Sequence, residues 1–371
     1  MLTRSLIFLI FICVGHLNVI TIPNQPTNVR EAFISFERVS IARKLRETMW
    51  RADVAHYSDI ARDGYLRAPF DINSPSVEFA FFPLYPLILW LIGRVTKDVI
   101  LTGAALSNLF LLCALVLLHK LTLALGNDQA TARRTIFYLA TFPVSYFFSV
   151  PLTESLFLFL TVASFYSARR EHWLTAGIFG AFASAARVNG VLLLPALLFM
   201  NFHQYRALKF RKLLGLFLIP VGLWAYMFYS WWLSGNAWAF KDAVAAWGRT
   251  PGFFLTPLLK YLIHPHQVME PWNFNLLNAA SALLCFGCIY LLLRRREWTL
   301  AIYAICSVLL PLSSGRLQSF DRYTLVFFPI FISLGQVAQG ERLDQTIRVV
   351  FVLLLGLMTA LFAANYSVAV A

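Results

Sequence analysis

The most polar stretch of an otherwise apolar chain is RADVAHYSDIARDGY, residues 51–65. It places His56 three residues and Tyr57 four residues after Asp53, a spacing that brings the side chains to one face of a helix. A carboxylate held within about 3 Å of a hydroxyl group can act as a general base. The structural alternative is that Asp53 and His56 form an ordinary solvated pair on a surface helix.

Further ionisable groups interrupt the later apolar segments. They occur in three short motifs: PLTESLF with Glu154, ARVNG with Arg187 and Asn189, and SGRLQSFDRY with Arg316, Asp321 and Arg322. An arginine inside an apolar run costs about 3 kcal/mol or more unless it is paired or solvated. We therefore expect Arg187 either to form an ion pair with Glu154 or Asp53, or to bind phosphate, which suits the guanidinium fork.

Several of these groups have simpler interpretations. Thr153 and Glu154 suit the N-cap and first turn of a helix, and Asp321 could pair with a neighbouring arginine. His264, His266 and Glu270 match no strong metal-binding motif, and an ordinary outer loop is the favoured interpretation. No carboxylate set has diagnostic metal spacing, so no cofactor is predicted and a divalent metal stays open.

The elements that position these groups are apolar helices. Hydrophobic residues make up 59% of the 371 residues and charged ones 13%, against about 25% in soluble domains. Apolar runs of spanning or near-spanning length are 5–22, 79–96, 101–122, 134–150, 153–168, 172–186, 190–202, 213–234, 275–293, 298–312, 323–338 and 348–366. The pattern predicts an all-α polytopic membrane protein, one domain over residues 1–371 with about 11 transmembrane helices.

The basic residues predict the orientation of these helices. They cluster at Arg133-Arg134, Arg169-Arg170, Arg206 to Lys212, and Arg294 to Arg296. Placing all four clusters in the cytoplasm leaves two large extracytoplasmic loops, 23–100 and 235–273. The assignment works if run 5–22 is an uncleaved anchor and run 79–96 dips into the outer leaflet without crossing, as its closely spaced Pro83 and Pro86 suggest.

This topology gathers the uncommon polar groups at the extracytoplasmic face. The net charge of +13 is explained by cytoplasmic loops, so a nucleic-acid partner is not expected. No phosphate-binding or dinucleotide motif is present, which favours a lipid-borne substrate. A lipid or anion transporter remains an alternative, although internal repeats and midplane charges are not seen. A non-catalytic membrane scaffold would need neither Asp53 nor Glu154.

Five motifs in order resemble the PIG-V type of mannosyltransferase, the GPI mannosyltransferase II family within the GT-C glycosyltransferases. They are DVAHYSDIARDGY, FAFFPLYPL, FP followed by PLTESLF, ARVNG, and FDRYTLVFFPIF, and they span about residues 45–335. The family usually has Trp directly before the acidic residue of the first motif, whereas Ala52 precedes Asp53 here and Trp50 lies further upstream.

The resemblance implies a GT-C-type bundle with interfacial or re-entrant helices in the first outer loop. It also implies inverting transfer of a sugar, with mannose favoured, from a polyprenyl-phosphate donor to a glycan or glycolipid acceptor in the membrane. A GT-C enzyme with another lipid-linked sugar is the main alternative. The active site would face the extracytoplasmic side of a bacterial plasma membrane, or the lumenal side of an ER membrane.

The resemblance also implies roles for individual residues. Asp53 would be the general base. Donor phosphate would be bound by Arg187, by Arg316 or Arg322, and by His56, which could instead position Asp53. Substrate would be positioned by Glu154, Asn189, Tyr57 and Asp321. Segment 79–96 would form a wall where the prenyl chain enters from lipid, with Pro83 and Tyr85 in structural rather than chemical roles.

Overall fold

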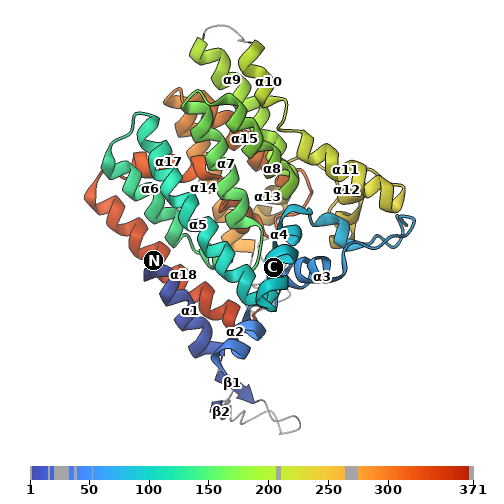
Figure 1. Ribbon diagram of the computed structural model, residues 1–371. Helices are drawn as coiled ribbons and strands as arrows, with labels where there is room; N and C mark the ends of the chain where they lie inside the picture. Colours follow the sequence, from blue (N-terminus) through green and yellow to red (C-terminus); the bar gives the residue numbers. More distant parts are fainter. Residues whose placement is uncertain are drawn as a thin grey trace.

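The computed structural model describes residues 2–15, 17–20, 33–36, 40–51, 53–205, 210–263 and 275–366. These residues are almost entirely helical (Figure 1). The first part contains α1 (Leu2–Gly15), β1 (Leu17–Ile20), β2 (Phe33–Phe36), α2 (Ile41–Met49), α3 (Val54–Asp63), η1 (Val77–Ala80) and α4 (Leu84–Thr96). The two strands pair antiparallel, with Leu17 opposite Phe36.

The remaining helices form the bundle and the second outer loop. The middle part contains α5 (Val99–Ala124), α6 (Gln129–Thr141), η2 (Ser145–Ser149), α7 (Glu154–Arg169), α8 (Trp173–Ala186), η3 (Val188–Leu192), α9 (Leu193–Tyr205), α10 (Phe210–Leu216) and α11 (Val221–Ser234). The last part contains α12 (Ala239–Ala243), η4 (Val244–Trp247), α13 (Thr256–Ile263), α14 (Asn275–Arg294), α15 (Trp298–Leu312), α16 (Phe320–Thr324), α17 (Phe328–Val337) and α18 (Glu341–Ala363).

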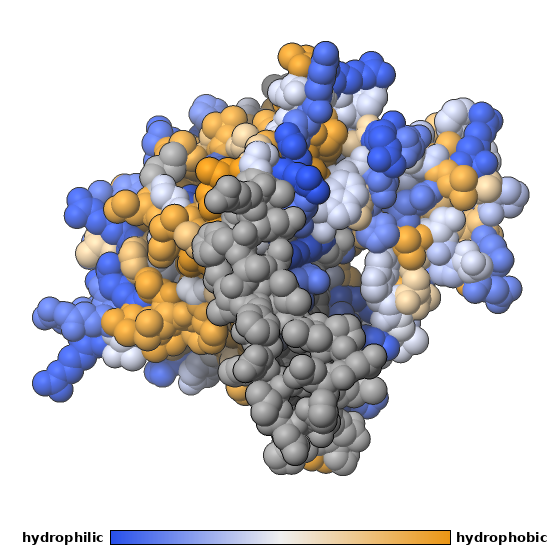
Figure 2. Space-filling view, turned by 90° about the horizontal axis from the view of Figure 1, so that it is seen from below, coloured by the Kyte–Doolittle hydropathy of each residue, from blue (hydrophilic) through white to orange (hydrophobic). Residues whose placement is uncertain are grey.

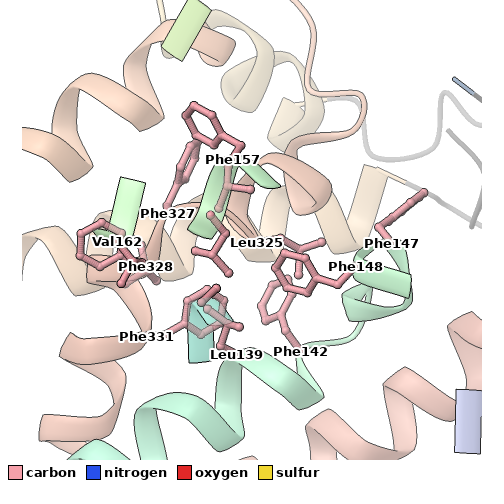
Figure 3. Packing of buried hydrophobic residues seen from close by; sticks show 14 of the residues in the cluster. Leu139, Phe142, Phe147, Phe148, Phe157, Val162, Leu325, Phe327, Phe328 and Phe331 are labelled. Atoms are coloured by element: carbon pink, nitrogen blue, oxygen red, sulfur yellow. The ribbon is translucent and has the colours of Figure 1, made fainter. Parts of the chain in front are cut away.

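Helix α7 lies in the centre of the bundle and packs against α5, α8 and α9, whereas α18 packs against α1 and α6 (Figure 1). Buried aromatic and aliphatic side chains from α6, η2, α7 and α17 fill the core around Phe142, Phe148 and Leu325 (Figure 3). Small residues allow the closest helix contact: a Cβ on Gly177 of α8 would lie 1.6 Å from the carbonyl oxygen of Gly215 in α10.

The apolar composition is displayed on the surface as well as in the core. Helix α18 exposes Val349, Leu353 and Leu357, and seen from below apolar side chains form a broad area on the left of the molecule (Figure 2). Exposed apolar area of this extent is typical of a lipid-facing wall. Four helical stretches in the described part are long and apolar enough to cross a membrane: Val99–Ala124, Lys212–Ser234, Leu276–Arg294 and Glu341–Ala363.

Three of the turns beside basic clusters, α5–α6, α7–α8 and α14–α15, meet at one end of the bundle. Arg169 at the end of α7 donates to the carbonyl of Ala124 at the end of α5. Gln336 near the end of α17 donates to both Asn127 and Glu297, in the α5–α6 and α14–α15 turns. The expected alternation of the chain between two ends of the bundle is therefore present from α5 onward. We call this end the basic end.

Segment 79–96 has the geometry that a non-crossing segment requires. Helix α4 begins only after Pro83. Before it, Phe81 packs on His56 and Tyr57 of α3, away from the basic end. After it, Asp98 caps α5 and pairs with Arg46 of α2 at 2.7 Å. Both ends of α4 thus contact helices that the sequence assigns to the first outer loop, and a segment that does not cross the membrane stays a prediction.

Several apolar runs do not form one continuous helix, and two of them show the local reason. Run 5–22 is not one helix: α1 ends at Gly15, and β1 takes residues 17–20, where β-branched residues favour an extended chain. Run 134–150 is divided, because α6 ends at Thr141, two residues before Pro143, which cannot continue the hydrogen-bond ladder.

Candidate active site

Asp53 occupies the N-cap position of α3, yet its carboxylate makes no capping hydrogen bond. Instead Oδ2 lies 2.5 Å from NH1 of Arg322. The side chain of Asp53 is 31% exposed. The carboxylate of Asp53 is thus paired with Arg322 of α16, in place of the solvated pair with His56 considered as an alternative, and it remains partly exposed.

Glu154 is the first residue of α7 and is completely buried. Its Oε1 atom accepts from Nε of Arg322 at 2.6 Å and from NH1 of Arg187 at 3.0 Å. Thr153 lies at the N-cap position but makes no capping bond; its hydroxyl group is 3.2 Å from that of Tyr57. Glu154 thus serves as the anion between two guanidinium groups, beyond any effect on the helix dipole.

Arg187 follows α8 in an extended conformation and leads directly into η3. The turn is tight because Gly190 packs on the backbone of Ala183 and Ser184, where an added Cβ would lie 2.3 Å from main-chain atoms. The glycine of the ARVNG motif therefore allows η3 to fold back on α8. This brings Arg187 beside Glu154, with its side chain 17% exposed.

Arg322 lies in the short helix α16, after Ser319 in a left-handed conformation, and its side chain is 8% exposed. Its guanidinium group also packs over the ring of Phe147, 4.9 Å from the centroid; Phe147 extends away from the other labelled core residues (Figure 3). Burial opposes the charge, but the carboxylates of Glu154 and Asp53 outweigh it and hold the pKa of Arg322 well above its usual value.

These four residues form one continuous series of ion pairs, Asp53–Arg322–Glu154–Arg187, which we call the ion-pair chain. The two inner members, Arg322 and Glu154, are buried, whereas the two ends, Asp53 and Arg187, reach the surface. Each charge has an opposite neighbour, as buried charges require. An accessible carboxylate and an accessible guanidinium group are thereby held at a fixed separation by two buried groups.

The structure places the other predicted residues around this chain. Tyr57 is buried beside Thr153, and burial raises the pKa of its phenol, which stays neutral. His56 stacks on Phe81, with ring centroids 4.7 Å apart. Asn189 is buried in η3. Asp321 is buried too, and its Oδ1 accepts the backbone N–H of Arg322 rather than a guanidinium group.

Arg316 is not brought into the chain. It is exposed, and its Nε donates to the carbonyl of Gly248 at 3.0 Å. Of the two arginines in this motif, only Arg322 therefore belongs to the ion-pair chain. Pro83 caps α4, and buried Tyr85 bonds to Ser107 of α5 at 3.0 Å, so both have structural contacts.

Sequence reasoning overlooked Arg249 and Tyr323. The guanidinium carbons of Arg187 and Arg249 lie 5.5 and 5.6 Å from the centroid of the Tyr323 ring. Arg249 comes from the second outer loop, outside the motifs. One feature of the sequence could have identified Arg249: no acidic residue occurs between Asp242 and Glu270, so its positive charge has no nearby partner in the sequence.

Within the described ranges, no group of three or more His, Cys, Asp and Glu side chains could hold a metal ion. His264, His266 and Glu270, considered above, lie outside the described residues. The arrangement of the ion-pair chain itself, with both carboxylates turned to guanidinium groups, suits acid–base and phosphate chemistry.

Comparisons with known proteins agree with the resemblance of the motifs. A curated rat protein named GPI alpha-1,6-mannosyltransferase 2 is 29% identical over 154 residues, which are 38% of this chain and 29% of the rat protein. The mouse protein of the same name is 30% identical over 158 residues, 40% of this chain and 30% of its own length. The matched region thus spans less than a third of these relatives.

Among solved structures, the chain is similar to the Archaeoglobus fulgidus oligosaccharyltransferase crystallised with Zn and sulfate. The TM-score is 0.46 and the identity 14%, covering 100% of this chain and 53% of that one. The profile of one sequence family, described as Mannosyltransferase (PIG-V), matches residues 2–218, which are more than half of the chain. The chain therefore belongs to the PIG-V mannosyltransferase family.

Proposed function

We propose that this protein is an inverting glycosyltransferase that moves a sugar from a polyprenyl-phosphate donor to an acceptor hydroxyl group. Mannose is the favoured sugar, supported by the family and by the name of the curated relatives. The observation that carries the proposal is the ion-pair chain, which ends in an accessible carboxylate and an accessible guanidinium group. The acceptor is a glycan or glycolipid, and both substrates meet in the membrane.

In this proposal Asp53 is the general base. Arg322 contacts only its Oδ2 atom, and no described residue donates to Oδ1. Oδ1 is available to accept the proton of the acceptor hydroxyl as the oxygen attacks the anomeric carbon. Attack from the side opposite the phosphate breaks the sugar–phosphate bond and inverts the configuration. The electron pair leaves on the polyprenyl phosphate.

Arg187 and Arg322 stabilise that leaving phosphate. Arg187 is the more exposed of the two, so it contacts the donor, and guanidinium donors directed at developing charge lower the barrier. Glu154 is a positioning residue that holds both arginines through one oxygen. Tyr57 and Asn189 shape the site beside them, and Asp321 holds the backbone of Arg322. His56, stacked on Phe81, would orient the start of α3 rather than bind phosphate.

We further propose that the site faces the extracytoplasmic side. It lies at the end of α7 opposite the basic end, and about 15 residues of helix, some 22 Å, separate Glu154 from Arg169. Basic turns are retained in the cytoplasm. In an ER membrane the same orientation would place the site in the lumen.

The test measures transfer of labelled sugar from polyprenyl-phosphate-mannose and, for comparison, from the glucose-linked lipid. Wild type is compared with Asp53→Asn for each donor. We expect the variant to lose about 10²- to 10⁴-fold in kcat while donor KM changes little. The matched control is Asp59→Asn, an exposed carboxylate of the same helix that pairs with Arg62. Equal turnover by Asp53→Asn and Asp59→Asn would refute the base assignment. Preference for the glucose donor would show that the protein is a GT-C glycosyltransferase that transfers a sugar other than mannose.

A further inference from the structure

The charges within the ion-pair chain cancel, so the chain has no net positive charge with which to bind a phosphate. It contains two carboxylates and two guanidinium groups, so Arg187 and Arg322 are already neutralised by Glu154 and Asp53. A donor phosphate brought to this site needs positive charge beyond these pairs. We propose that Arg249 supplies it, and that an apolar groove beside Arg249 receives the first part of the donor's lipid chain.

Arg249 is a cation without a carboxylate partner among the described residues. Its guanidinium group donates to Oγ of Ser314 at 3.1 Å and to the carbonyl of Gln318 at 3.4 Å. Neither contact neutralises the charge. The Tyr323 ring, next to Arg322 in the sequence, contacts both Arg249 and Arg187. Arg249 is therefore held beside the exposed end of the ion-pair chain, and its positive charge is available to bind an anion.

The groove begins where Arg249 is anchored. It has a volume of about 380 Å³ and is lined by Leu192, Gly252, Phe253, Phe254, Cys306, Leu309, Leu310 and Ser313. Ser313 is adjacent to Ser314, the hydrogen-bond partner of Arg249. Leu192 ends η3, the element that follows Arg187. One end of the groove thus lies near the two guanidinium groups.

The lining of the groove suits an isoprenoid rather than a polar chain. Its side chains are mostly apolar, and Phe253 and Leu310 are exposed. Cys306 lies about one helical turn before Leu309 and Leu310 on α15, which runs toward the site end. The groove therefore follows the last turns of α15, beside the segment that carries Arg249. A chain lying there would place its phosphate at Arg249, as an amphipathic donor requires.

This inference rests on the proposed function and deepens it by naming where the donor's lipid chain lies. From the sequence, segment 79–96 is expected to form a wall where the chain enters, with Pro83 and Tyr85 in structural roles. Tyr85 is fully buried and bonded to α5. Segment 79–96 also exposes Leu87, Leu91 and Val95, so its role as a wall stays a prediction. The groove between α15 and the loop carrying Arg249 is a separate apolar surface beside Arg249.

Two variants separate the phosphate contact from the chain contact. Arg249→Ala removes the cation, and Arg249→Lys retains charge without the guanidinium fork. Gly252→Phe fills the groove: a Cβ on Gly252 meets only the carbonyl oxygen of Thr250, 3.9 Å away, so the backbone need not shift. The control for the first is Arg67→Ala, an exposed arginine that also stacks on an aromatic ring, Trp232. The control for the second is Gly287→Phe, on α14, where a Cβ meets no atom within 4 Å.

The probes are polyprenyl phosphate and the polyprenol of equal length, bound to the protein in nanodiscs. We expect wild type to prefer the phosphate, Arg249→Ala to lose about tenfold of phosphate affinity and to leave alcohol binding unchanged, and Arg249→Lys to retain most of it. Gly252→Phe should weaken both probes about equally. Arg67→Ala and Gly287→Phe should bind as wild type. Unchanged phosphate binding by Arg249→Ala, or equal losses in the controls, would overturn the inference.

Sugar transfer is measured in parallel and distinguishes the two proposals. If wild type binds polyprenyl phosphate through Arg249 but transfers no sugar from any lipid-linked donor, the lipid-phosphate site is supported and the glycosyltransferase function is refuted. If transfer proceeds in Arg249→Ala with an unchanged donor KM, the function stands and the role of Arg249 falls.

Discussion

Asp53 and Arg322 are 269 residues apart in the chain, and their carboxylate oxygen and guanidinium nitrogen lie 2.5 Å apart. The contact joins the first outer loop to the short helix α16. Through its Nε the same guanidinium group holds Glu154 at 2.6 Å. One buried cation therefore connects three distant segments of the chain, and the integrity of the site depends on it.

Replacing Arg322 with Lys should reduce both stability and transfer, because an ammonium group cannot reproduce the fixed fork that serves two carboxylates at once. Removing the charge with Arg322→Met should cost about 3–5 kcal/mol of unfolding free energy, since it leaves Glu154 with one partner and Asp53 with none. Thermal unfolding in detergent measures both. Arg62→Lys, which alters an exposed cation between Asp59 and Asp63, is the control and should change little. Equal effects at Arg62 and Arg322 would contradict the central position of Arg322.

Replacing Gly190 with Ala should destabilise the protein and displace Arg187. The added Cβ would lie 2.3 Å from the backbone of Ala183 and Ser184, which cannot move without shifting α8. Overpacking of this kind costs about 1–3 kcal/mol. Unfolding temperature and donor KM are the measurements, with Gly356→Ala as control, because nothing lies within 4 Å of a Cβ there. A Gly190→Ala variant as stable as Gly356→Ala would show that η3 can relax away from α8.

Asp321 should give stability a pH dependence of its own. Burial raises the pKa of its carboxyl group to about 6, above the value of about 3.9 in an unfolded chain. The native state then holds the proton more tightly, so the contribution to stability is complete below pH 4 and is lost as pH rises through about 6. The difference amounts to about 3 kcal/mol.

The measurement is chemical unfolding of wild type and Asp321→Asn between pH 4 and pH 7. The stability of wild type relative to the variant should fall across this range, because Asn cannot ionise. Parallel curves for the two proteins would mean that Asp321 has the same pKa in both states.

The topology at the end of α4 can be tested by cysteine labelling. In a background with the five native cysteines replaced, Lys97→Cys should react with an impermeant reagent applied from the extracytoplasmic side, because Asp98 pairs with Arg46 of the first outer loop. A cysteine replacing Arg170, in a basic turn, is the control and should react only from the cytoplasm. Labelling of position 97 from the cytoplasm alone would show that segment 79–96 crosses the membrane.

Much of the molecule follows from local pattern. Apolar runs predict the helices α5, α7, α14 and α15 almost to their ends, because buried or lipid-facing helices need continuous apolar residues. The spacing of Asp53 and Tyr57 predicts the shared face of α3. The alternation of basic clusters predicts which residues meet at the same end of the bundle, since each helix simply carries the chain from one end to the other.

Which side chains touch was decided by the tertiary structure alone. From the sequence, Arg316 and Arg322 were equal candidates, and Arg249 had no motif to mark it. Arg322 joins Asp53 and Glu154 because α16 packs against α14 and α15 with this side chain directed to the start of α7, while Arg316 donates to the carbonyl of Gly248. Periodicity specifies the face and the end at which a residue lies. The partners of Arg322 lie 168 residues away for Glu154 and 269 for Asp53. Which residues meet over such separations depends on how whole helices and loops pack together, and no local pattern encodes that.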